Sequence, residues 1–178
     1  MNKNKIVFTF ATAEVNFIGQ IFIKITELLT GKLKLKKLYD EYLSENRPPE
    51  LFWDDAVDKL NFTLITNFQD GSYIPKKGKL IVIANHAFGV ADGVSICSAI
   101  SKVRQDYKMV THKVLRQAEA VKDKILPIDF NENREALITN INTRKEAEKV
   151  LHNEGVLVLF PSGTIATKQN LKKNTKAD

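Results

Sequence analysis

The sequence from residue 80 to residue 93 reads Leu-Ile-Val-Ile-Ala-Asn-His-Ala-Phe-Gly-Val-Ala-Asp-Gly. Its first part, 80–84, is continuously apolar, which is typical of a strand that is buried on both faces of a parallel sheet. The residues that follow predict a loop that leads into a helix over 92–103. His86 and Asp92 lie six positions apart, just beyond the carboxyl end of this strand. The stretch therefore predicts both a strand-to-helix unit and a base with a nearby carboxylate.

The chain beyond residue 93 repeats this alternation of strands and helices. Apolar runs predict strands over 107–111, 125–128 and 156–160, and helical spacing predicts a helix over about 134–153 that ends at Gly155. We therefore predict an α/β fold with a mixed, mainly parallel sheet that is flanked by helices. Ligands of such sheets gather beyond the carboxyl ends of the strands. We expect the His86 loop and the second strand end, 159–164, to meet there.

The first 60 residues are predicted to form an N-terminal helical segment. Helical spacing predicts an amphipathic helix within 6–29 and further helices over 34–46 and 49–60, before a short strand over 62–66. Two interpretations of the first helix stay open, since it suits either a membrane interface or packing on the core. The predicted divisions are the helical segment 1–60, the α/β core 61–167 and a basic, disordered tail, 168–178.

The net charge of +6 is concentrated at the two ends of the chain. Residues 1–37 carry +5 and residues 168–178 carry +3, which leaves −2 for the residues between them. Basic ends on a near-neutral body favour a membrane lipid surface over nucleic acid as a partner. The sequence contains neither an apolar run of transmembrane length nor a signal-peptide pattern. We therefore expect a cytoplasmic protein that is peripheral on the inner face of the membrane.

The cysteine and histidine content argues against disulfide and metal chemistry. Cys97 is the single cysteine of the sequence and lies in the apolar run 94–100, where a buried, unreactive thiol is the ordinary occupant. The sequence has no Cys/His cluster with the spacing of zinc ligands. We therefore expect no bound metal and a reducing compartment.

His86 and Asp92 have the chemistry of a general base and the carboxylate that orients it. Such a pair takes a proton from an alcohol while the carboxylate stabilises the imidazolium that forms. Ser162 lacks the Gly-x-Ser-x-Gly context of a nucleophile, so the pair suits activation of a substrate hydroxyl or amine for attack on an ester or thioester. The structural alternative stays open: Asp92 caps the helix and His86 bonds to the backbone of a turn.

Several ordered blocks of the sequence resemble a known enzyme family. The stretch 85–93 is similar to the first signature block of the glycerolipid and lysophospholipid acyltransferase superfamily. Five residues separate His86 from Asp92, as in its hemolysin-like and ornithine-lipid acyltransferase branch, whose pattern is Asn-His-Pro-Phe-Gly-Gly-x-Asp-Gly. Further similar blocks occur in order at 29–32, 38–40, 103–108, 126–130 and 160–163. The resemblance covers nearly the whole of 28–167.

The resemblance implies an acyl transfer in which His86 deprotonates the acceptor and Asp92 orients His86. The last block is similar to the family's Phe-Pro-Glu-Gly-Thr-Arg, whose Glu and Arg help to bind a phosphate, but this chain has Ser162 and Ile165 there. That departure favours an acceptor with another head group, such as a lyso-ornithine lipid. The substrate-binding residues that we predict are Asn85, Phe88, Gly89, Gly93, Arg134, Phe160, Pro161, Ser162, Gly163 and Thr164.

Some of these assignments have a structural alternative that stays open. Arg134 suits either a charge contact with substrate or a solvated helix start, and Gly163 and Thr164 suit either an anion-binding turn or a plain one.

The resemblance also implies the partners of the reaction. It implies no cofactor, acyl-CoA or acyl carrier protein as the acyl donor, and a lysolipid as the acceptor. Members of the superfamily normally continue past the Phe-Pro block into another strand with an apolar-Pro motif, whereas this sequence ends at Asp178. Two expectations therefore stand: a working acyltransferase, or a truncated and inactive member that binds membrane lipid.

Overall fold

The structure, a computed structural model, describes residues 32–65 and 73–162. Within these ranges the chain forms α-helices, short 3-10 helices and strands in an alternating order. The elements are α2 (Lys32–Ser44), η1 (Pro49–Leu51), α3 (Phe52–Lys59), β1 (Leu80–Ile83), α4 (Val90–Ser101), β2 (Tyr107–His112), η2 (Lys113–Gln117), η3 (Lys122–Lys124), β3 (Ile125–Ile128), α5 (Arg134–His152) and β4 (Val156–Leu159).

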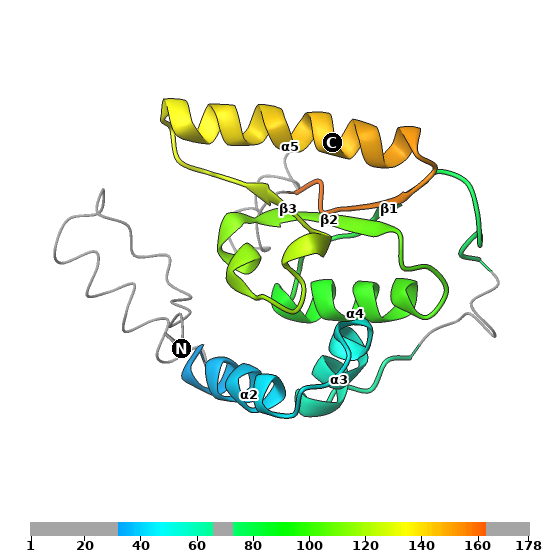
Figure 1. The fold of residues 1–178 in the computed structure, drawn as a ribbon, viewed down its shortest axis with the longest axis vertical. Helices are drawn as coiled ribbons and strands as arrows, with labels where there is room; N and C mark the ends of the chain where they lie inside the picture. The colour runs from blue at the N-terminus through cyan, green and yellow to red at the C-terminus, as the bar shows by residue number, and fades with distance from the viewer. Residues whose placement is uncertain (1–31, 66–72, 163–178) are drawn as a thin grey trace, which may run out of the picture.

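The strands of the described residues form one parallel sheet with the order β1-β4-β2-β3. The sheet lies between helices, with α5 on one face and α4 and α3 on the other (Figure 1). This arrangement confirms the predicted α/β fold with a parallel sheet flanked by helices. All four strands point the same way, so their carboxyl ends lie along one edge.

The main hydrophobic core lies between the sheet and α4. Val156 and Val158 of β4 are fully buried there and pack with Cys97 of α4. Trp53 of α3 reaches the same core, where its Nε1 donates a hydrogen bond of 2.5 Å to the Tyr107 hydroxyl. Burial raises the pKa of the Cys97 thiol to about 12. This fits the expected role of Cys97 as a buried, unreactive thiol.

The second face of the sheet is covered only in part. Helix α5 packs on β3, β2 and β4. The hydroxyl of its Thr143 donates a hydrogen bond of 2.6 Å to the Pro127 carbonyl. Ile81 and Ile83 of β1 point to this same face and are 48% and 65% exposed. The expectation that 80–84 is buried on both faces is therefore wrong for β1, because β1 lies at the sheet edge beyond the reach of α5.

The predicted strand over 62–66 is wrong where the structure describes it. Residues 62–65 form no strand. Instead, the Phe62 amide donates a hydrogen bond of 3.0 Å to the carbonyl of Val57 in α3, so Phe62 belongs to the C-terminal turn of that helix. Ile65 is 88% exposed, so its apolar character does not reflect burial in a sheet. Residue 66, the predicted helix within 6–29 and the tail at 168–178 lie outside the described residues.

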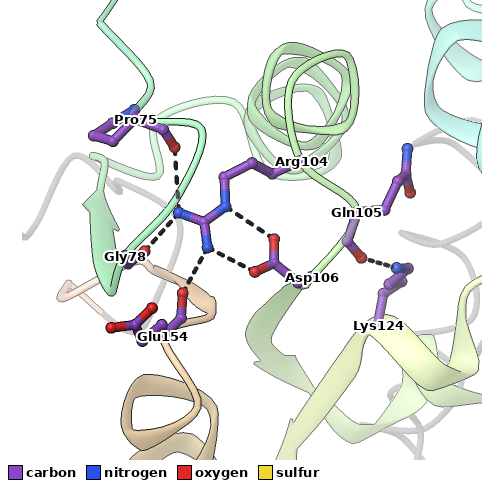
Figure 2. A network of polar contacts seen from close by, with 7 residues as sticks. All are labelled: Pro75, Gly78, Arg104, Gln105, Asp106, Lys124 and Glu154. Atoms are coloured by element: carbon purple, nitrogen blue, oxygen red, sulfur yellow. Dashed lines mark hydrogen bonds and ion pairs between the residues drawn. The ribbon is translucent and has the colours of Figure 1, made fainter.

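The amino ends of three strands are joined by one buried arginine, Arg104, in the loop between α4 and β2 (Figure 2). Its guanidinium donates to the carbonyls of Pro75, Gly78 and Glu154 at 3.2, 2.6 and 2.6 Å. It also forms a two-point ion pair with Asp106, at 2.9 and 2.6 Å, which lowers the pKa of that carboxyl. Arg104 thereby fixes the edge of the sheet opposite to the carboxyl ends.

Candidate active site

The His86 loop and the Phe160 block lie side by side at the carboxyl edge of the sheet. Strands β1 and β4 are neighbours, with Ile83 paired to Leu159, and the Ala84 amide donates 3.1 Å to the Leu159 carbonyl. The rings of His86 and Phe160 are 4.5 Å apart between centroids. The structure therefore brings together His86 and Phe160, which are 74 residues apart in the sequence.

The side chains of His86 and Asp92 face each other across the loop. His86 Nδ1 lies 3.4 Å from Asp92 Oδ2, and the two side chains are 22% and 16% exposed. The same Oδ2 accepts a hydrogen bond of 2.8 Å from the Phe88 amide, which fixes the carboxylate inside the loop. Within the described residues, the buried Nδ1 has no hydrogen-bond partner. A small rotation of the His86 ring toward Asp92 would give Nδ1 a hydrogen bond to the carboxylate. Catalytic hydrogen bonds often tighten in this way only when substrate binds.

The loop geometry depends on Gly89. Helix α4 begins at Val90, two residues before the predicted start, and Gly89 is its N-cap with φ 63° and ψ −117°. Only glycine adopts this conformation without strain. Asp92 therefore lies inside the first turn, not at the cap, and its carboxylate points back to the loop. The alternative in which Asp92 caps the helix is thus wrong, because Gly89 occupies that position.

The other predicted residues of the first block differ in their surroundings. Asn85 is exposed and Phe88 is 79% exposed at the rim of the loop. Gly93 faces the core instead, since a Cβ atom there would lie 3.7 Å from the Met109 sulfur. A Cβ atom at that distance would make only ordinary contact, so the packing of α4 on β2 does not require glycine at 93. Its contact with substrate stays a prediction.

The second block is described only in its first half. Phe160 is partly buried against the core, whereas Pro161 and Ser162 are exposed in a turn. Gly163 and Thr164 lie outside the described residues.

Arg134 is exposed at the start of α5, after β3, which is three strand positions from β1. At about 4.8 Å per strand, β3 lies about 14 Å from β1, whose end carries the pair of His86 and Asp92 (the dyad). The structure therefore does not bring Arg134 next to His86.

A polar cluster at the ends of β2 and β3 was not among the predicted site residues. Asp129 is 6% exposed and pairs with Lys113 at 2.6 Å, which lowers the pKa of the Asp129 carboxyl. His112 stacks on Phe130, with centroids 5.6 Å apart, and its Nδ1 accepts 3.1 Å from the Val114 amide. Burial lowers the pKa of His112. A histidine and a lysine at a predicted strand end were the sequence signal for this cluster.

The described residues contain neither a metal-binding cluster nor a membrane-spanning helix. In 32–65 and 73–162, no group of three or more His, Cys, Asp or Glu side chains is placed to hold a metal ion. None of the helices in those ranges is long and apolar enough to cross a membrane.

The chain matches a known protein family. A family model described as Acyltransferase matches residues 65–177, which is more than half of the chain. No curated protein and no solved structure matches the chain.

Proposed function

Because this chain belongs to the Acyltransferase family, we propose that it moves a fatty acyl group from acyl-CoA or acyl carrier protein to a hydroxyl of a lysolipid. The observation that carries the proposal is the contact of 3.4 Å between His86 Nδ1 and Asp92 Oδ2 at the carboxyl edge of a parallel sheet. The family match covers this pair and the neighbouring Phe160 block.

In the proposed reaction His86 acts as the general base. Nδ1–H donates to Asp92, which leaves the Nε2 lone pair to take the proton of the acceptor hydroxyl. The oxygen attacks the thioester carbonyl, the C–S bond breaks, and the proton passes from His86 to the departing thiolate. Asp92 stabilises the imidazolium between these two steps. Its hydrogen bond from the Phe88 amide keeps the carboxylate in place throughout.

The proposed acceptor is a lysolipid whose head group is not a simple phosphate, as in the hemolysin-like and ornithine-lipid branch. Ser162 and Ile165 supply no charge at the positions where family members carry Glu and Arg. We place the enzyme on the inner face of the membrane, where the basic segment 1–37 meets anionic lipid.

The alternative is a lipid-binding member without turnover, and the neutral Ser162 is the observation that favours it. Release of free thiol from acyl-CoA, measured with a panel of lysolipids and with glycerol 3-phosphate, separates the two proposals. Acyl transfer predicts release that depends on a lysolipid, with the acylated lipid identified by mass spectrometry. Vesicle binding with no acceptor-dependent release and no acylated lipid contradicts acyl transfer and supports lipid binding alone.

A further inference from the structure

Several of the large apolar side chains that are exposed in the described residues lie near the carboxyl edge of the sheet, while others, such as Leu43 and Leu51, lie elsewhere. Phe130 follows β3 and is 54% exposed, and Leu137, Ile138 and Ile141 in the first half of α5 are 60%, 50% and 45% exposed. We call these four residues the apolar corner. Around the dyad at the same edge, the exposed apolar residues are Ile83, Phe88 and Val90.

Two residues of the apolar corner, Ile138 and Ile141, belong to a stripe on the outer side of α5. Arg134, Ile138, Ile141 and Lys145 are spaced by four, three and four residues, which places them on one side of the helix. Each is exposed, and they lie opposite to the sheet-facing positions, which include the buried Thr143. The core of the protein therefore gives no reason for isoleucine at 138 and 141.

The stripe has the composition of a helix that lies on an anionic lipid surface. Ile138 and Ile141 can enter the boundary between the lipid head groups and the acyl chains. Arg134 lies about one helical turn before them and Lys145 about one turn after them, and the long side chains of these two residues can reach lipid head groups. Helix α5 begins beside the edge that carries His86 (Figure 1). The stripe therefore begins at the same edge of the sheet as the candidate active site.

We propose that the apolar corner, with Arg134 and Lys145, docks the protein on anionic membrane lipid. This inference rests on the proposed function, because a lysolipid acceptor resides in a membrane. The apolar corner would give the protein a second contact with the membrane, in addition to the contact proposed for segment 1–37.

The structure offers a direct probe of this contact. Cys97 is fully buried with a raised pKa, so a thiol-reactive fluorophore labels a cysteine introduced by Ile141→Cys selectively. Leu51→Cys is the matched control, since Leu51 is 41% exposed in η1, on the other side of the sheet (Figure 1). The full chain is mixed with vesicles of phosphatidylcholine alone or of equal parts phosphatidylcholine and phosphatidylglycerol.

We expect the emission of the fluorophore at 141 to shift to shorter wavelength on the anionic vesicles, while the emission of the fluorophore at 51 stays unchanged. Replacement of both Arg134 and Lys145 by Gln should weaken vesicle binding about thirtyfold, at about 1 kcal/mol for each cation. Replacement of the exposed Lys76 and Lys77 at the opposite edge is the charge-matched control and should have a smaller effect.

Three outcomes overturn the proposal. One is vesicle binding with no response at 141. A second is a blue shift without vesicles that grows with protein concentration, which indicates a second copy on the stripe. A third is emission at 141 that is already blue-shifted without vesicles and does not change with protein concentration, which indicates that another part of the chain covers the stripe. None of these outcomes affects acceptor-dependent thiol release, so the proposed function is tested separately.

Discussion

At the scale of single residues, the loop between β1 and α4 is defined by one conformation and one pair of side chains. Gly89 turns the chain with a positive φ, so that Asp92 enters the first turn of α4 and its carboxylate points back toward His86. The spacing of His86 and Asp92 was visible in the sequence. The part played by Gly89 was not, because a loop glycine does not reveal its φ before the neighbouring elements are placed.

Gly89→Ala is expected to destabilise the protein by about 1–3 kcal/mol, because a Cβ atom is strained at this φ and ψ. Urea denaturation measures the free energy of unfolding. Gly93→Ala is the matched control, since Gly93 is helical and a Cβ atom there makes only ordinary contact with Met109. The control should be neutral or slightly stabilising. Equal effects of the two substitutions would show that the loop does not depend on the Gly89 conformation.

His112 is expected to make the free energy of unfolding depend on pH. Burial lowers its pKa in the folded protein, so the unfolded chain binds the proton more tightly. Stability should therefore be complete above the ordinary histidine pKa of about 6.5 and fall as the pH decreases below it. His112→Asn should flatten the dependence between about pH 7.5 and 5.5. An unchanged slope in His112→Asn contradicts this assignment.

At the scale of secondary-structure elements, continuous hydrophobic runs and helical periodicity identified the strands and α-helices after residue 79 to within about two residues, but not the short 3-10 helices η2 and η3. They did so because each run is short and is bounded by polar residues. The same reasoning failed over 62–65, where a run rich in β-branched residues has no strand partner and follows directly from α3. A strand needs a neighbour, and a single run of sequence does not say whether one is present.

Arg104 shows how connections stabilise these elements. Arg104→Lys is expected to cost about 2–4 kcal/mol of unfolding free energy, because one ammonium cannot serve three carbonyls and both Asp106 oxygens. Arg144→Lys is the matched control, since Arg144 forms an exposed pair with Glu148 and should change stability by less than about 0.5 kcal/mol. A loss at Arg104 no larger than at Arg144 contradicts the proposed role of Arg104.

At the scale of the whole molecule, the two ends of the parallel strands differ in their roles. Arg104 ties the amino edge, while the carboxyl edge carries the His86 loop and the Phe160 block. The meeting of these blocks was predictable, since the ends of parallel strands share an edge. The distance of Arg134 from the dyad was not predictable, because it depends on the strand order β1-β4-β2-β3. The cluster of His112, Lys113 and Asp129 is visible only once β2 and β3 are paired.

The central claim is that His86 is the general base of an acyl transfer at this edge. Acceptor-dependent release of thiol from acyl-CoA tests it most directly, in His86→Ala beside the control His152→Ala, which removes an exposed histidine at the far end of α5. We predict that His86→Ala lowers the rate by about 10²–10⁴-fold with the fold intact by circular dichroism, while His152→Ala keeps the wild-type rate. A folded His86→Ala protein that releases thiol at the wild-type rate would contradict the account.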